Sequence, residues 1–260
     1  MKPRVLVLRA PGINRDNDAA FACELAGARV DLVHVNRVAA GDVRLANYAM
    51  LVVPGGFSYG DHLGAGRLLA VDLIHRLGEP LRAFVADARP VIGICNGFQV
   101  LVKAGVLPGW QDGAARPAVT LTDNHSGRFE CRWVQLQADA SSPCIFTRTI
   151  SQPIEVPVAH GEGRIAVSDD AALARLRSAG LIALRYHSPA GSAAYPANPN
   201  GSVDAIAGLT NPAGNVLGLM PHPENAILPH QHPRWTREAP RQEGDGMAIF
   251  RNAVQYAASL

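Results

Sequence analysis

The sequence predicts an α/β fold built around a mostly parallel sheet, and three observations lead to this prediction. Short apolar runs alternate along the chain with segments that have helical spacing. Consecutive strands joined by helices favour a parallel sheet with right-handed crossovers. The central apolar runs are unbroken, as is usual for strands covered on both faces. Turns rich in glycine follow two of these runs, at the strand ends where such sheets form their sites.

The predicted elements follow in order along the chain. Strands are expected at residues 4–8, 29–35, 48–53, 91–95, 128–136, 181–186 and 216–220. Helices are expected at residues 17–26, 66–88, 96–104 and 245–259, the last with Met247, Phe250, Val254 and Tyr256 as packing residues. Residues 107–118 and 225–244 are rich in Pro, Gly and Gln and are predicted to be surface loops. We expect residues 1–260 to form a single domain, because this length buries ample core.

A cysteine stands at the turn from a predicted strand into a predicted helix, in the segment Gly93-Ile94-Cys95-Asn96-Gly97. This arrangement is typical of a nucleophile elbow, in which glycines two residues either side allow backbone to approach backbone. The common alternative for such a cysteine is a small buried hydrophobic residue. No two of the four cysteines have the spacing of metal ligands, so no zinc site is expected.

A base and a carboxylate follow another apolar run, in Pro221-His222-Pro223-Glu224. Because a residue before proline favours extended backbone, His222 is predicted to be extended, with Glu224 projecting to the same side. Glu224 can then accept a hydrogen bond from one ring nitrogen and leave the other for Cys95. The N-terminus of the following helix and the imidazolium favour the thiolate. Together these residues have the composition of a nucleophile, base and orienter triad.

Two glycines, Gly55 and Gly56, come directly after the strand predicted at residues 48–53. An N–H group from one of them, together with the N–H group of Asn96, would give two donors for a developing oxyanion. Many glycine turns after strands serve only the turn, which is the alternative here.

Three histidines, His222, His230 and His232, offer a rival hypothesis, because imidazoles at such spacing can bind a transition metal. The intervening residues 225–231 have the pattern of a loop, which fixes no ligand geometry. A solvated loop accounts better for His230 and His232, and no metal is expected.

Composition excludes several classes of function. Hydrophobic residues make up 48% and charged residues 18% of the chain, and the formal net charge is +2. Lys and Arg are scattered without a basic run, so nucleic-acid binding is not expected. The first apolar run, residues 5–8, is too short for a leader or a membrane span. With few cysteines and none in paired spacing, we expect a cytoplasmic enzyme.

These motifs resemble the class I, or triad, glutamine amidotransferases. The resemblance is carried by residues 93–99 (Gly-Ile-Cys-Asn-Gly-Phe-Gln), 54–61 (Pro-Gly-Gly-Phe-Ser-Tyr-Gly-Asp) and 222–224 (His-Pro-Glu). Within that class the chain is most similar to the glutaminases of phosphoribosylformylglycinamidine synthase. The narrower resemblance is carried by residues 128–130 (Arg-Phe-Glu), 160–164 (His-Gly-Glu-Gly-Arg) and 195–202 (Tyr-Pro-Ala-Asn-Pro-Asn-Gly-Ser).

The resemblance implies a fold and a reaction. The fold is flavodoxin-like, with helices flanking the sheet and a small antiparallel extension. Cys95 attacks the side-chain amide of L-glutamine, ammonia leaves, and water hydrolyses the γ-glutamyl thioester. His222 acts as general base and then acid, and Glu224 orients it. The implied substrate contacts are Gln99, the backbone of Gly55 and Gly56, and, toward the α-amino and carboxylate groups or a partner, Arg128, His160 and Glu162. For residues 160–163 a hairpin turn is the alternative.

The resemblance also implies partners. Ammonia passes by channelling to a large synthetase subunit that uses ATP and Mg²⁺ in purine biosynthesis, and a small bridging subunit joins the complex. The chain has no Gly-x₄-Gly-Lys-[Ser/Thr] phosphate loop, so no cofactor is expected in it. Three alternatives are the glutaminase of another amidotransferase, a related cysteine hydrolase with the same elbow, and a catalytically silent binding subunit. The His-x-Glu order argues against the hydrolase, and the intact triad argues against the silent subunit.

Overall fold

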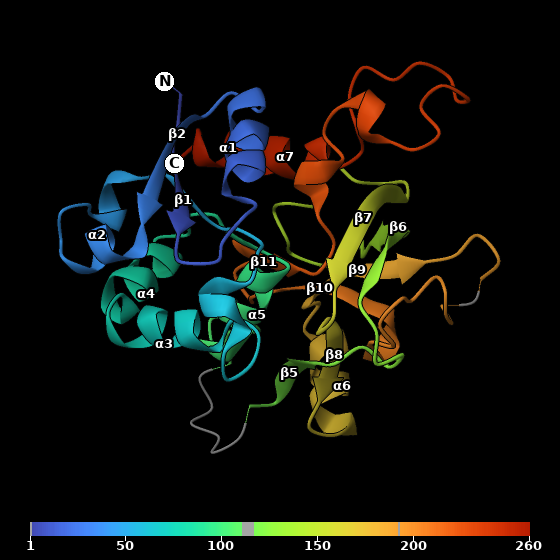
Figure 1. Cartoon of the computed structure of the whole chain (residues 1–260), viewed down its shortest axis with the longest axis horizontal. Helices are drawn as coiled ribbons and strands as arrows, with labels where there is room; N and C mark the ends of the chain where they lie inside the picture. Colours follow the sequence, from blue (N-terminus) through green and yellow to red (C-terminus); the bar gives the residue numbers. More distant parts are fainter. Residues whose placement is uncertain (1, 111–116, 192) are drawn as a thin grey trace.

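The structure is a computed structural model that describes residues 2–110, 117–191 and 193–260. Its main feature is a nine-stranded sheet in the order β2-β1-β3-β4-β11-β10-β9-β6-β7 (Figure 1). The strands are β1 (Arg4–Arg9), β2 (Arg29–His34), β3 (Met50–Val53), β4 (Val91–Ile94), β6 (Glu130–Ala138), β7 (Ile154–His160), β9 (Ile182–His187), β10 (Ile206–Thr210) and β11 (Val216–Leu219). A separate antiparallel pair consists of β5 (Val119–Thr122) and β8 (Arg164–Val167).

The strands from β2 to β11 in the sheet order are parallel. The three at the centre, β3, β4 and β11, are buried along their whole length, because helices cover both faces. On one face lie α1 (Asp16–Leu25) and α7 (Met247–Ala257) (Figure 1). On the other lie α3 (Arg67–His75), α4 (Gly78–Ala86) and α5 (Asn96–Lys103). The predicted α/β class with a central parallel sheet is confirmed.

The antiparallel extension is larger than predicted, since β10, β9, β6 and β7 continue the same sheet. No strand was predicted for β5, β7, β8 or β10, and no helix for α2 (Val35–Ala39) or α6 (Asp170–Ser178). In β7 the reason is Pro157, because proline within a run argues against a central strand. Among the described strands β7 lies at the edge and pairs with β6 alone, and an edge tolerates a residue that cannot donate.

The single helix predicted for residues 66–88 is wrong, because the chain forms α3 and α4 with a break between them. Pro80 explains the break. In a continuous helix its ring would clash with the carbonyl group of Arg76, whereas the first turn of a new helix accommodates proline.

The ends of the chain follow the predictions more closely. The final helix is α7, shorter by two residues at each end than predicted, and it buries Met247, Phe250 and Val254 while Tyr256 is half-buried. Of the predicted loop at 107–118, residues 111–116 lie outside the described residues. Among the helices of the described residues, none combines the length and the hydropathy needed to span a membrane.

A prediction concerns Gly97, on the first turn of α5. A Cβ there would lie 1.8 Å from the backbone oxygen of Val53, and backbone in a buried strand cannot move aside. We expect Gly97→Ala to lower the free energy of unfolding by about 3 kcal/mol or more, as severe overpacking does. Gly78→Ala is the matched control, because a Cβ there meets only the mobile end of Arg82. Urea unfolding measures both, and equal stability of the two variants would contradict the close approach.

Candidate functional site

Cys95 lies at the sharp turn between β4 and α5. Its φ of 51° and ψ of −105° are a backbone conformation that side chains rarely adopt. The flanking glycines make this turn possible, since a Cβ on Gly93 would lie 2.7 Å from the carbonyl oxygen of Gly97. Sγ of Cys95 lies 3.8 Å from the carbonyl oxygen of Ala159 in β7. The geometry expected for a nucleophile elbow is therefore present at Cys95.

His222 leaves the sheet next to Cys95, because β11 is the parallel neighbour of β4. Its Nδ1 lies 2.7 Å from Oε1 of Glu224, and both residues are buried. Since a carboxylate only accepts, Nδ1 is the donor. The extended backbone predicted for this segment is wrong, however, because the chain is not extended after His222. Pro223–Asn225 forms a 3₁₀ turn, and this turn brings the carboxylate back to the imidazole.

The electrostatics join Cys95 to this pair. Burial disfavours a charged imidazole, but the Glu224 carboxylate and the Cys95 sulfur outweigh it and raise the pKa of His222 well above its ordinary value. Nε2 of His222 is buried without a hydrogen bond to any described residue. The ring lies against Gly55, where a Cβ would come within 2.9 Å of Cε1. Cys95 and the pair His222 and Glu224, which are remote from each other in the sequence, thus form one buried group.

The backbone after β3 turns toward Cys95 at Gly55 and Gly56. Gly56 has a φ of 148°, and a Cβ on it would lie 2.7 Å from the carbonyl oxygen of Gly12. The N–H group of Phe57 fixes this approach by donating to the same oxygen at 2.9 Å. Within the described parts of the chain, the N–H groups of Gly55, Gly56 and Asn96 donate no hydrogen bond. Unpaired N–H groups at these positions are what the predicted oxyanion donors require.

The next segment, residues 57–66, is named here the glycine loop. It contains three non-glycine residues with left-handed backbone, Tyr59, Asp61 and Leu63, a conformation that persists only when the surroundings hold it. The side chain of Asn96 supplies one such contact, since its Oδ1 accepts a hydrogen bond from the N–H group of Ser58 at 3.1 Å.

The 161–163 turn is linked by hydrogen bonds both to α5 and to the glycine loop. Gln99 donates through Nε2 to the carbonyl oxygen of Glu162 at 2.5 Å and accepts from Nδ2 of Asn96 at 3.0 Å. Glu162 accepts the N–H group of Ala65, at the far end of the glycine loop, at 3.4 Å. The hairpin alternative for residues 160–163 is wrong, because β8 pairs with β5 and not with β7.

His160 ends β7 and is buried beside His222. Burial and the charge of His222 lower the pKa of His160 to about 4. Its Nδ1 lies 3.1 Å from Oδ1 of Asn124, which also accepts the N–H group of Gly163 at 3.0 Å. Nε2 of His160 is buried without a hydrogen bond to any described residue.

The remaining predicted contact, Arg128, has an exposed side chain. Only its carbonyl group reaches this region, where it accepts Nδ2 of Asn124 at 2.8 Å. Sequence reasoning missed Asn124, although it links Arg128, His160 and Gly163. Its polar loop between β5 and β6 gives no periodic signal.

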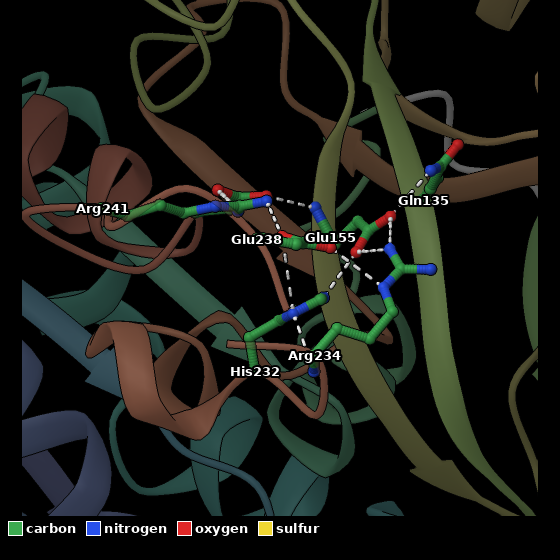
Figure 2. Close-up of polar contacts among 7 residues, drawn as sticks. Gln135, Glu155, His232, Arg234, Glu238 and Arg241 are labelled. Atoms are coloured by element: carbon green, nitrogen blue, oxygen red, sulfur yellow. Dashed lines mark hydrogen bonds and ion pairs between the residues drawn. The ribbon is translucent and has the colours of Figure 1, made fainter. Parts of the chain in front are cut away.

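A second cluster of charged side chains lies on the long loop after the triad (Figure 2). Nε2 of His232 lies 2.5 Å from Glu155 in β7, and its Nδ1 accepts the N–H group of Arg234 at 3.3 Å. Arg234 also pairs with Glu155 at 3.1 Å, and Arg241 pairs with Glu238 at 2.6 Å. Ligand atoms of Glu155, His232 and Glu238 lie within 4.8 Å of one another, but both carboxylates already pair with guanidinium groups.

This cluster decides between the two accounts of the histidines. His232 contacts Glu155 and His222 contacts Glu224, so in the described chain the two imidazoles do not share a site. His232 is not solvated either, because it is buried edge-on against Trp133 with ring centroids 4.9 Å apart. The loop is ordered, and its ion pairs attach it to β7.

The comparisons with known proteins agree with this geometry. Residues 2–257 match the family model of the CobB/CobQ-like glutamine amidotransferase domain. Over 260 residues the chain is 45% identical to phosphoribosylformylglycinamidine synthase subunit PurQ of Dehalococcoides mccartyi, covering 100% of this chain and 99% of the relative. The PurQ subunit of Treponema denticola is 49% identical, over 88% of this chain and 90% of the relative.

Solved structures give the same result. The chain is similar to a chain of PurLQS from Thermotoga maritima with a TM-score of 0.73 and 32% identity, covering 98% of this chain and 99% of that one. A glutamine amidotransferase from Thermotoga maritima shares the fold at 15% identity, with a TM-score of 0.57 and complete coverage of both chains. The chain therefore belongs to the glutamine amidotransferases, in the family of the PurQ subunits of phosphoribosylformylglycinamidine synthase.

Proposed function

We propose that this chain is the glutaminase subunit of a phosphoribosylformylglycinamidine synthase, which hydrolyses L-glutamine and supplies the ammonia to a synthetase partner. The observation that carries the proposal is the buried group formed by Cys95, His222 and Glu224 at neighbouring strand ends. Membership of the PurQ family gives this group its substrate and its place in a complex.

The first half of the reaction forms a thioester. His222 takes the proton of the Cys95 thiol as general base. Sγ forms a bond to Cδ of the glutamine amide, and the carbonyl electrons move to the oxygen. N–H groups of Gly55 or Gly56 and of Asn96 donate to that oxyanion, and one such donor typically contributes a factor of roughly 10²–10³ in kcat. His222 then gives its proton to the amide nitrogen, the C–N bond breaks, and ammonia leaves.

The second half restores the enzyme. A water molecule gives a proton to His222 and attacks the γ-glutamyl thioester. The C–S bond breaks, Sγ regains the proton from His222, and glutamate leaves. Glu224 holds the imidazole in one orientation throughout. His160 stays neutral at pH 7 because its pKa is about 4, so it does not compete with His222 as the acid.

We assign the α-amino and carboxylate groups of glutamine to Gln99, His160 and the 161–163 turn around Glu162. The contacts of Gln99 with Asn96 and Glu162 support this assignment, since they hold Gln99 and the 161–163 turn near Asn96, the residue that follows Cys95. Arg128 we assign to the partner side, because its side chain is exposed.

Ammonia is useful to the complex only if it does not escape into water, so the site must be covered by the partner. We infer a large synthetase subunit that binds ATP and Mg²⁺, a small bridging subunit, and a cytoplasmic complex. Exposed apolar side chains near the site support a docking role: Phe57 and Leu63 on the glycine loop and Phe129 beside Gly161.

The first test separates use of glutamine from use of ammonia. Cys95→Ala in the reconstituted complex should lower the glutamine-dependent synthesis rate by at least about 10³-fold, because the nucleophile is lost. Synthesis from added ammonium chloride should stay within twofold of wild type, because the synthetase site is intact. Cys131→Ala, at an exposed cysteine, is the matched control. If Cys95→Ala lost both activities, Cys95 would be needed for assembly instead of chemistry.

The second test uses the depressed pKa of His160, which is about 4 in the fold against 6.5 as the ordinary value. The unfolded chain therefore binds more protons between these values, and stability falls as the pH falls through this window. In His160→Gln the loss of unfolding free energy from pH 7 to pH 5 should be smaller than in wild type by about 2 kcal/mol.

Urea unfolding at the two pH values measures this difference. His75→Gln, at an exposed position on α3, should lose as much stability as wild type. Equal losses for His160→Gln and wild type would mean that His160 titrates normally.

A further inference from the structure

One face of α5 carries three polar side chains, Asn96, Gln99 and Lys103. They stand at positions i, i+3 and i+7, which lie on the same side of a helix. Asn96 accepts a hydrogen bond from the glycine loop at 3.1 Å, and Gln99 donates one to the 161–163 turn at 2.5 Å. This polar face therefore joins the two segments that flank the nucleophile. Lys103, at its end, has no part in the mechanism described so far.

Lys103 is an unusual residue in this chain, because Lys2 and Lys103 are the only lysines among 24 basic residues. Its Nζ is buried and makes no hydrogen bond to a described residue. Burial lowers the pKa of Lys103, while the carboxylates of Glu162 and Asp61 oppose that change and Arg67 adds to it. A buried ammonium without hydrogen bonds costs free energy, so its charge must offset something nearby.

The two carboxylates are what it offsets. Asp61 lies on the glycine loop and accepts Nδ2 of Asn96 at 3.3 Å, while Glu162 lies on the turn and accepts the N–H group of Ala65 at 3.4 Å. Burial and the charge of Glu162 raise the pKa of Asp61, so the two anions disfavour each other. The positive charge of Lys103 acts on both carboxylates, and a cation near a carboxylate favours its charged form.

We propose that Lys103 is a positioning residue for the glutaminase reaction, whose ammonium holds the glycine loop and the 161–163 turn together beside Cys95. The inference rests on the proposed function, because it matters only if N–H groups next to the glycine loop receive the oxyanion. The loop continues directly from Gly56. When the loop shifts, the donors shift with it, and a misplacement of about 1 Å can cost roughly a hundredfold in rate.

The test is Lys103→Met in the reconstituted complex, which keeps the length of the side chain and removes its charge. The glutamine-dependent kcat should fall by about 10- to 100-fold with a smaller change in KM, because the transition state loses more than the bound substrate. Ammonia-dependent synthesis should stay within twofold of wild type. Lys2→Met, the same substitution at an exposed lysine, should leave both activities unchanged.

A double-mutant cycle separates charge from packing. If Lys103 acts by offsetting the carboxylates, Lys103→Met should lower kcat at least about fivefold less in a Glu162→Gln background than in wild type. An equal loss in both backgrounds would overturn the proposal, and so would a wild-type kcat for Lys103→Met. If thermal unfolding shows that Lys103→Met does not fold, Lys103→Gln replaces it with the same expected losses. A wild-type complex that releases no glutamate from glutamine would refute the proposed function instead.

Discussion

The structure depends on one close approach of backbone to backbone, at the end of β4. Cys95 holds a left-handed conformation there, and Gly97 comes so near the carbonyl oxygen of Val53 that no side chain fits. This contact sets the start of α5 against the end of β3. The turn at Cys95 therefore lies close to the strand end that leads into Gly55 and Gly56. The parallel pairing of β4 with β11 then brings His222 to the same edge of the sheet as Cys95, although the two residues are far apart in the sequence.

Charged groups surround Cys95 in two layers. In the inner layer His222 is stabilised as a cation against its burial, whereas His160 is kept neutral. Two imidazoles with displaced pKa values can take different roles at one pH. In the outer layer the buried Nζ of Lys103 interacts electrostatically with two carboxylates on the segments that shape the site. Positioning and chemistry thus use separate charged groups.

The sequence was most informative where a local rule has few exceptions. The glycine frame of Cys95 and the unbroken apolar strands predicted both the parallel half of the sheet and the position of the elbow. The pairing of His222 with Glu224 was also predicted, although a 3₁₀ turn produces it and not extended chain. A carboxylate two residues after the histidine reaches the ring in either conformation. The contact was therefore predicted correctly, although the predicted backbone conformation was wrong.

Other features could not be predicted because they depend on distant contacts. β7 was not predicted because it contains Pro157, and nothing in the local sequence indicates that this strand lies at the edge of the sheet. His232 has the sequence context of a solvated loop, but it pairs with Glu155, far earlier in the chain (Figure 2). It also packs against Trp133. Asn124 and Lys103 have no motif of their own. Their roles follow only from the hydrogen bonds and charges that the fold brings to them.

The most direct measurement of the central claim is the site at which an electrophilic glutamine analogue labels the protein. Exposure alone favours Cys131, which is open to solvent, whereas Cys95 is almost buried. The account predicts a single adduct at Cys95 by intact-mass analysis and peptide mapping, with protection by free L-glutamine. Labelling that favours Cys131, or that glutamine does not prevent, would contradict it.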